Sequence, residues 1–469
     1  MGFGGGLYTE QNKTLPGAYF KFKSASSGIT TYATRGVVGL IAPADWADDA
    51  AMRLVIPDLE ADNKGAYVWP RDAKKAIGRD AYVSLPASYS GASDLAAWLP
   101  IFVREIFRNA SACYIYPLMG SNKAKASCKY ATAAKYGTRG NDLSLKIVAD
   151  GSNFVVTTML DGETVDEQTV AAYGDLAANA WVVFDKTGVD LAAEAAVTFE
   201  GGISGTATQA DAITAVDALG NLGVNVVVPL VELTDAKLYD AFVAQNEKYG
   251  HWMQLVAPYN SKAFPEGGSE YVTCPDVANS AIDTILLCPW VAGAESACDL
   301  GGTLDNRAYD GEIIDWLVNN EGLKPPTQEA LTSGMKSGYM MLHTVGTTWG
   351  VLNDDNTLIE YTETKDEAFH RNQTIRVLQT LANDWYAIFT NEFLGKAGTD
   401  ESDRTNYKMR LVKSAQNFEK QSAIRNFDSK DITVSEGEQS DSYYVQYSVQ
   451  PNYCARKVYH DITVAAFNS

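Results

Sequence analysis

The segment DSYYVQYSVQPNYCARKVYHDITVAAF, residues 441–467, has the pattern of two strands joined by a turn. The apolar residues that alternate with polar ones are Val445, Tyr447 and Val449 in the first half and Val458, Ile462 and Val464 in the second. Alternation with a period of two predicts half-buried strands. Pro451 and Asn452 supply the break between them. The sequence therefore predicts a terminal β-hairpin.

A terminal hairpin exposes a sheet edge, and such an edge can add a strand from another molecule. A hairpin alone is only marginally stable in water, so this one needs a partner in its own subunit or in a neighbour. Near the other end, GAYFKFKS (residues 17–24) also alternates, with Phe20 and Phe22 opposite Tyr19. Two extended arms indicate a subunit of a larger assembly. The alternative is that both arms complete the chain's own sheets.

Length and composition indicate a large globular protein. The 469 residues are enough for two to four domains. With 46% hydrophobic and 20% charged residues, the chain has globular rather than disordered composition. The net charge of −20 argues against nucleic-acid binding, which needs clustered Lys and Arg.

Targeting and cysteine patterns predict a protein that is neither exported nor inserted in a membrane. The first residues, MGFGGGLYTEQNKTLPG, have neither the basic nor the apolar region of a signal peptide. No apolar run reaches the roughly 18 residues that a transmembrane helix needs. The six cysteines form no C-x-x-C pair and no zinc spacing with the histidines, which predicts free thiols in a reducing cytoplasm.

Strand and helix patterns alternate through much of the chain, which predicts an α/β core with a mostly parallel sheet. Core strands are expected at residues 34–41, 112–118, 224–231, 253–257, 282–290 and 339–345, and helices at 94–108, 209–219 and 235–249. Between them, short alternating runs separated by Asp150-Gly151 and Asp161-Gly162 predict an inserted antiparallel β-domain.

The C-terminal part has two amphipathic helix patterns and an acidic stretch, residues 428–441, which is expected to be a linker. The predicted organisation is an N-terminal arm at 1–29, an α/β core at 30–120 and 203–350, an inserted β-domain at 121–202, a C-terminal α+β domain at 351–438, and a C-terminal β-arm at 439–469.

Catalytic and cofactor motifs are absent from the sequence. There is no G-x-S-x-G elbow, Walker A loop, H-E-x-x-H motif, or G-x-G-x-x-G placed between a strand and a helix. The four histidines are scattered singly, and sequence alone cannot reveal a carboxylate pair of the glycosidase type. The sequence therefore predicts no catalytic residue, no cofactor and no metal site, and a protein that is not an enzyme.

A basic helix face stands out in an acidic chain. Arg410, Lys413 and Lys420 fall on the outward face of the second C-terminal helix. This face is either simply solvated or a docking surface for an acidic partner.

Several stretches, in order along essentially the whole chain, carry a family resemblance. They are residues 16–19 (PGAY), Arg35-Gly36, AAKYGTRGNDLSLKI at 133–147, Gly201-Gly202 with Gly205, NEFLGKAG at 391–398, and SAIRNFD at 422–428. With them the chain resembles the contractile tail sheath proteins of myovirus-type phages. The resemblance is closest to sheaths of Gram-positive prophages and phage-tail-like bacteriocins. It departs from the family at GTDESDR, residues 398–404.

The resemblance implies a fold and a mechanical function. The fold would be a core of subtilisin-like topology with no protease activity, an inserted β-sandwich, and a C-terminal domain that faces a tail tube. The function would be a self-assembling sheath that polymerises around the tube and contracts to drive it through a target cell envelope. Strand exchange through the arms would join neighbouring subunits.

The implied partners are neighbouring subunits, the tail tube protein, and baseplate and tail terminator proteins, in a virion or tail-like particle assembled in the bacterial host cytoplasm. Tyr19, Phe20, Phe22 and the six apolar residues of the terminal segment would lie in intersubunit contacts, and the basic face would meet the tube. Neither nucleic-acid binding nor membrane insertion is expected. The alternatives are a self-assembling surface-layer or adhesin subunit, which the missing export signal disfavours, and a cytoplasmic hydrolase with an unrecognised site.

Overall fold

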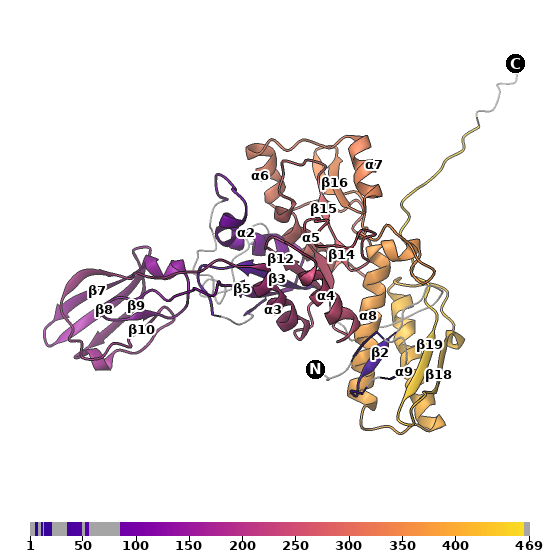
Figure 1. Ribbon diagram of the computed structural model, residues 1–469, viewed down its shortest axis with the longest axis horizontal. Coiled ribbons are helices and arrows are strands. Elements are labelled where there is room, and N and C mark those ends of the chain that lie inside the picture. Colours follow the sequence, from indigo (N-terminus) through magenta and orange to yellow (C-terminus); the bar gives the residue numbers. More distant parts are fainter. Residues whose placement is uncertain are drawn as a thin grey trace, which may run out of the picture.

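A six-stranded sheet forms the centre of the computed structural model, which describes residues 5–7, 11–12, 14–20, 35–48, 52–55 and 85–463 (Figure 1). The strand order is β14 (Val272–Thr273), β13 (Gln254–Val256), β12 (Val226–Pro229), β3 (Val37–Pro43), β5 (Ala112–Leu118) and β4 (Met52–Val55). All neighbours are parallel except β4, which runs antiparallel to β5. The predicted α/β core with a mostly parallel sheet is confirmed.

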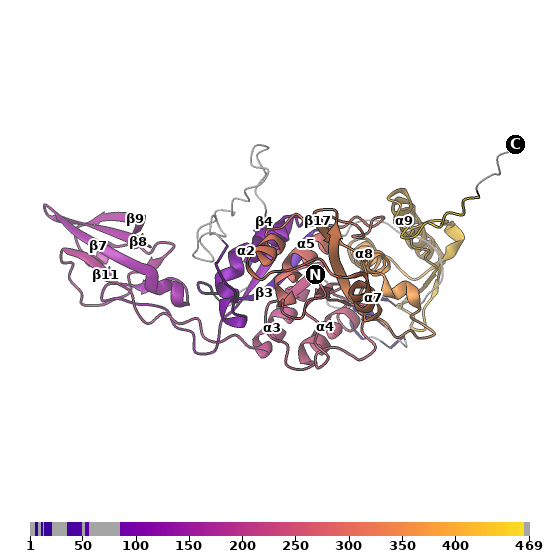
Figure 2. The same ribbon diagram turned by 90° about the horizontal axis from the view of Figure 1, so that it is seen from above.

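Helices cover both faces of this sheet (Figure 2). Successive side chains of a strand point to opposite faces, so Val226 and Val228 pack with α2 (Leu95–Phe107) and α5 (Cys288–Ala297), whereas Val227 packs with α3 (Gln209–Gly220) and α4 (Lys237–Glu247). This double burial explains why β12 is the uninterrupted apolar run VVVP.

The strand expected at residues 282–290 is wrong. The segment forms the 3₁₀ turn η4 (Thr284–Leu286) and the start of the buried helix α5. A short apolar run cannot by itself separate a buried strand from a buried helix. Pro289 near the start of α5 is the signal that favoured a helix, because proline suits the first helical turn.

The residues between β5 and α3 form an antiparallel β-domain that projects from the core (Figure 1). One sheet has the order β11 (Glu194–Thr198), β7 (Leu143–Asp150), β8 (Asn153–Leu160), β9 (Glu163–Val170), and a second pairs β10 (Val182–Val183) with β6 (Thr132–Ala133). Both sheets contribute to one apolar core. Asp161 and Gly162, in the loop between β8 and β9, have φ values of 53° and 84°, as a two-residue hairpin turn requires.

The remaining elements form two groups beside the core: a small sheet with two helices, and a C-terminal domain. A three-stranded sheet joins β15 (Pro275–Asp276), β16 (Met340–Val345) and β17 (Thr348–Val351), and α6 (Ile313–Asn320) and α7 (Gln328–Lys336) lie in the same part of the fold (Figure 1). The C-terminal domain packs α8 (Asn372–Ile388) and α9 (Glu401–Lys420) against a hairpin of β18 (Ile432–Glu436) and β19 (Tyr443–Tyr447).

The short elements complete the description. They are β1 (Gly5–Leu7), β2 (Ala18–Phe20), the π-helical turn η6 (Phe389–Phe393), and the 3₁₀ turns η1 (Ala92–Asp94), η2 (Thr138–Asp142), η3 (Tyr173–Asp175), η5 (Glu367–His370) and η7 (Ser429–Asp431). In the departing stretch 398–404, the Asp400 side chain accepts hydrogen bonds from the backbone N–H groups of Ser402 and Asp403, and so caps α9.

All six cysteines are free thiols, as predicted. Among the described residues, no helix combines the length and the apolar character needed to cross a membrane.

The contact between α2 and α5 depends on a glycine. A Cβ atom added at Gly293 would lie 2.4 Å from the backbone oxygen of Ile106, closer than real Cβ contacts allow. We expect Gly293→Ala to force these two buried helices apart and to lower the free energy of unfolding by about 1–3 kcal/mol. Gly174→Ala is the matched control, because a Cβ there meets no atom within 4 Å. Thermal denaturation that shows equal stability for both variants would contradict this account of the packing.

Candidate functional site: the chain ends and the charge cluster beneath them

The segment near the N-terminus packs on the C-terminal half of its own subunit. β2 pairs in parallel with β1, with Phe20 opposite Leu7. The Phe20 ring meets Trp252 edge-on at a centroid separation of 6.2 Å and joins the rim of the C-terminal apolar cluster. The Tyr19 hydroxyl donates a hydrogen bond to the Leu15 carbonyl at 2.7 Å. Phe22 lies outside the described residues, so the intersubunit role of Tyr19, Phe20 and Phe22 stays a prediction.

The terminal hairpin pairs differently from the prediction. β19 pairs with β18, with Val445 opposite Val434 and Tyr447 opposite Ile432. The predicted linker 428–441 therefore holds a strand and the turn of the hairpin, which the Gly437 N–H closes by donating to the Ser442 carbonyl at 2.9 Å. The alternation of Ile432 and Val434 with polar residues was the missed signal, obscured by the surrounding acidic residues.

One face of β19 is held by its own domain. The Tyr447 ring lies 4.6 Å from that of Trp385 on α8, and Val445 and Val449 pack against the same cluster. Among the described strands, β18 and β19 pair only with each other, so the outer edges of this two-stranded sheet carry no partner strand. These edges are the places where a further strand could add.

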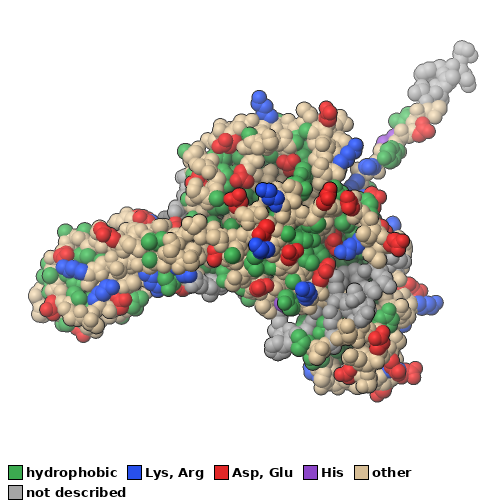
Figure 3. Space-filling view, viewed as in Figure 1, with side chains coloured by type: hydrophobic (Ala, Val, Ile, Leu, Met, Phe, Trp, Pro, Cys, Tyr) green, Lys and Arg blue, Asp and Glu red, His purple; other side chains and the backbone are tan. Residues whose placement is uncertain are grey.

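The second predicted strand is an extended tail that leaves the molecule (Figure 1). Val458, Tyr459 and Ile462 are 72%, 88% and 81% exposed, and Figure 3 shows hydrophobic side chains on this projection, away from the body of the protein. Val464 lies outside the described residues. A terminal hairpin within residues 441–467 is therefore wrong for the isolated subunit. A run of large apolar side chains in solvent indicates a surface that another molecule covers.

The three cations on the basic face of α9 differ in their contacts. Arg410 makes an ion pair with Glu392 of η6 through two hydrogen bonds, one of them 2.5 Å from Nε to Oε2. The charge of Arg410 is therefore already paired within the subunit. Lys413 and Lys420 are exposed. A docking role for the face stays a prediction.

A titratable group lies between α8 and α9. Asp384 accepts a hydrogen bond from the Ser414 hydroxyl at 2.9 Å, and Ser414 accepts one from the Trp385 indole at 3.1 Å. Burial raises the pKa of the Asp384 carboxyl to about 7, although the Ser414 hydrogen bond and Arg410 act in the opposite direction.

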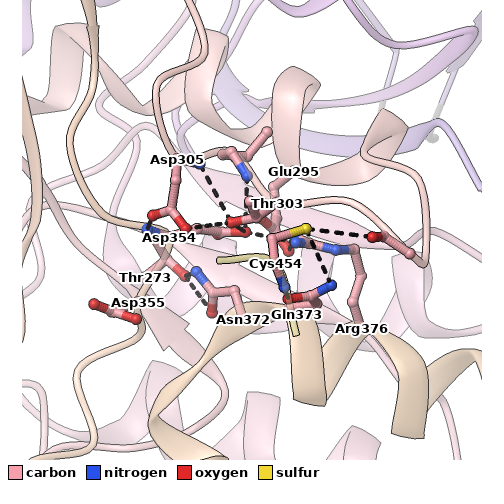
Figure 4. Close-up of polar contacts among 12 residues, drawn as sticks. Thr273, Glu295, Thr303, Asp305, Asp354, Asp355, Asn372, Gln373, Arg376 and Cys454 are labelled. Atoms are coloured by element: carbon pink, nitrogen blue, oxygen red, sulfur yellow. Dashed lines mark hydrogen bonds and ion pairs between the residues drawn. The ribbon is translucent and has the colours of Figure 1, made fainter. Parts of the chain in front are cut away.

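A larger charged site lies where α8 meets the core, and we call it the arginine–carboxylate cluster (Figure 4). It consists of Arg35, Arg376, Arg456, Glu295, Asp305, Asp354 and Asp355. At its centre Arg376 of α8 pairs with Glu295 of α5 and, at 2.6 Å, with Asp354, and all three side chains are fully buried. Buried charges require such pairing because desolvation strongly penalises an isolated charge.

The pKa values in the cluster reflect this balance. Burial opposes ionisation of Asp354, but Arg376 and the Leu304 N–H lower its pKa below the usual value. Burial raises the pKa of Glu295 against the effect of Arg376. Burial, and next the like charge of Arg376, lower the pKa of Arg35 to about 10. The central arginine is thus held between two acidic side chains, which ties α8 to α5 and to the loop of Asp354.

The outer part of the cluster binds the start of the tail. Arg456 donates from Nε to Asp305 at 2.5 Å and from Nη1 to Asp355 at 2.7 Å. Asp305 also accepts the Asp354 N–H at 2.8 Å, which joins the outer and central parts. These residues are spread from position 35 to position 456, so no local sequence pattern could have predicted the cluster.

A cavity of about 260 Å³ lies at the carboxyl ends of β12 and β13, the edge at which α/β enzymes bind ligands. Its polar groups include Glu232 and Asp283, and the Tyr89 hydroxyl donates to Asp283 at 2.9 Å. The described residues that line it include no histidine, cysteine, serine, lysine or arginine. No group of three or more His, Cys, Asp or Glu side chains in the described part of the chain is placed to hold a metal ion.

The architecture combines an open-edged sheet with an exposed apolar tail. Residues 364–465 match the family described as the phage tail sheath C-terminal domain. The protein XkdK of the phage-like element PBSX from Bacillus subtilis (strain 168) is 25% identical, and the alignment covers 98% of this chain and 99% of that protein. The uncharacterized protein YqbK of the same organism is also 25% identical, with the same coverage.

Two crystal structures have a similar fold. The sheath tail protein of Desulfitobacterium hafniense superposes with a TM-score of 0.70 at 23% identity, over 93% of this chain and 96% of that one. That of Listeria innocua gives 0.68 at 20% identity, over 90% and 93%. The resemblance to the tail sheath family is confirmed. The chain is thus similar over nearly its whole length to structural phage proteins, which are not enzymes, and its fold is that of sheath tail proteins.

The raised pKa of Asp384 predicts a pH dependence of stability. An acid whose pKa is higher in the folded state contributes its full stability below its unfolded-state pKa of about 4, and this contribution is lost progressively as the pH rises to about 7. Asp384→Asn cannot ionise, so we expect it to raise the melting temperature relative to wild type by more at pH 8 than at pH 5. The exposed Asp441→Asn is the control and should show no such difference. Equal effects of Asp384→Asn at both pH values would contradict the proposed ionisation.

Proposed function

We propose that this chain is the repeating subunit of a contractile tail sheath, which polymerises around a tail tube and contracts to drive the tube through a target cell envelope. The observation that carries the proposal is the exposed apolar tail, residues 457–463, in a subunit whose β18–β19 sheet has open edges. The tail supplies a strand without a partner, and the sheet supplies an edge without a neighbour. Exchange between identical subunits satisfies both.

Strand exchange gives the strength and mobility that a contracting polymer needs. Backbone hydrogen bonds to the edge of a sheet are directional, and burial of each large apolar tail residue contributes roughly 1.5–3 kcal/mol. Several such arms on each subunit add through avidity. The tail is one extended segment, so subunits can rotate relative to each other while the exchanged strand stays in its sheet. The two-strand pattern of residues 441–467 then has an explanation, because the second strand forms in the sheet of a neighbour.

The remaining features of the proposal concern the core and the partners. A subtilisin-like topology is supported by the parallel order in which β3 lies between β12 and β5. The partners are the tail tube protein and the baseplate and tail terminator proteins of a phage or phage-tail-like particle assembled in the bacterial host cytoplasm. Lys413 and Lys420 are the cations we assign to tube contact, because Arg410 is already paired with Glu392.

The tail exchange predicts that one face of the tail is essential for polymerisation. Ile462→Asp places a charge on the apolar face of the expected strand, and burying that charge in a neighbour's sheet is strongly unfavourable. Thr463→Asp adds the same charge at the next position, on the opposite face. Negative-stain electron microscopy of wild type and Thr463→Asp should show hollow striated tubes, whereas Ile462→Asp should remain monomeric with an unchanged melting temperature.

Three outcomes would contradict these assignments. Tubes from Ile462→Asp equal in number and length to those of wild type would exclude tail exchange. Flat lattices from the wild-type chain would instead favour a surface-layer subunit. If the wild-type chain forms no tubes even when co-expressed with its tail tube protein, the sheath function itself is wrong.

A tube contact through the α9 lysines predicts that binding to the tail tube depends on their charge, whereas contacts between sheath subunits do not. The double variant Lys413→Glu/Lys420→Glu should reduce co-sedimentation with the tail tube protein by about tenfold or more at low salt, and less at high salt because ions screen surface charges. Lys146→Glu/Lys336→Glu carries the same charge change at exposed positions outside α9. Equal co-sedimentation of both double variants would remove α9 from the tube contact.

A further inference from the structure

The segment that leads into the tail, residues 450–456, is bound to its own subunit. The Asn452 N–H donates to the Ala423 carbonyl at 3.0 Å, Gln373 donates to the Asn452 carbonyl at 2.9 Å, and Cys454 contacts the Gly301 carbonyl at 3.4 Å. The Arg456 side chain is still only 20% exposed. From position 457 to 463 every residue is exposed. Arg456 is thus the point at which the tail leaves the subunit.

Arg456 is held by two carboxylates from separate parts of the chain. Asp305 follows α5 and Asp355 follows β17, and their side chains are only 16% and 5% exposed. Charge-assisted hydrogen bonds with limited solvent access are stronger than neutral or fully exposed ones. A guanidinium can bind both carboxylates at once, whereas an ammonium group lacks this fork geometry.

The same cluster reaches the root of the N-terminal arm. Arg35 stands between the arm expected at residues 1–29 and strand β3, and its guanidinium donates to the Glu295 carbonyl at 2.8 Å and to the Thr380 hydroxyl at 3.3 Å. The Glu295 carboxylate pairs with Arg376, which pairs with Asp354. Asp354 donates its N–H to Asp305, which binds Arg456. A continuous chain of polar contacts therefore joins residue 35 to residue 456.

We propose that Arg456 is the anchoring residue of the C-terminal tail, and that the arginine–carboxylate cluster couples the root of this tail to the root of the N-terminal arm. A force that pulls on the tail acts on Arg456 first, because the described residues beyond it have no buried side chain. The cluster then passes the force to α8, α5 and Arg35. The anchor itself rests on the subunit geometry, and its consequence for assembly rests on the proposed sheath function.

Hydrogen exchange of the full-length chain, followed by mass spectrometry below the concentration of assembly, tests the anchor. In Arg456→Gln, the amides of Asn452 and Cys454 should exchange about tenfold faster or more, because loss of both ion pairs frees the tail root. Lys457→Gln removes the same charge one position further along and should leave exchange unchanged. Arg456→Lys, which keeps the charge but not the fork, should be intermediate.

Coupling predicts an effect at the other end of the cluster. The amides of Gly36 and Val37 donate to the Ser296 carbonyl and to Asn225, and in Arg456→Gln they should also exchange faster. The exchange rates of the amides of β7 and β8 in the projecting domain should be the same as in wild type. Faster exchange at 450–456 alone would overturn the coupling, and unchanged exchange there would overturn the anchor. Faster exchange everywhere would show general destabilisation and would overturn both.

Electron microscopy separates this inference from the proposed function. If wild type forms tubes, Arg456→Gln should form fewer and shorter ones, whereas Lys457→Gln should match wild type. Tubes of equal number and length from Arg456→Gln would overturn the anchor's role in assembly. If wild type forms no tubes with its tube protein, the sheath function fails, while the exchange experiment still decides whether Arg456 anchors the tail.

Discussion

The buried guanidinium of Arg376 is the interaction on which the joint between core and C-terminal domain depends. A fully buried charge is tolerated only where opposite charges and hydrogen bonds surround it, and here Glu295 and Asp354 supply them. This requirement fixes α8 against α5 and against the loop that carries Asp354. Because Asp354 also binds the loop of Asp305, the position of the tail root follows from the same constraint.

The joint has a mechanical meaning under the proposed strand exchange between subunits. Its hairpin sheet has open edges, and its tail exposes apolar side chains that water solvates poorly. A subunit that passes a strand to its neighbour needs a mobile segment beyond a fixed point, since a tail that peels from its own root transmits no force. The bound residues 450–456 correspond to the fixed point, and the exposed residues 457–463 correspond to the segment beyond it.

The differences between prediction and structure have separate physical causes. Residues 282–290 were assigned to a strand because an apolar run fits both a buried strand and a buried helix, and α5 shows which of them the packing favours. The hairpin was assigned to the wrong pair of segments because β18 lies among acidic residues, while the tail carries the stronger alternation. Strand alternation reports that a segment can be half-buried, and it does not identify the partner strand.

The sequence by itself determined the elements whose signals are local. The apolar periods of α2, α3, α4, α8 and α9 and the Asp-Gly turns of the β-domain follow from patterns within a few residues of each other, and the parallel core follows from the order in which strand and helix patterns alternate. The ordered resemblance along the chain determined the sheath relationship. Only the tertiary structure decided which strands pair, that Arg410 is already bound, and that Arg35, Arg376 and Arg456 share one cluster. Those facts depend on contacts between residues up to several hundred positions apart, and such contacts form only when the chain packs.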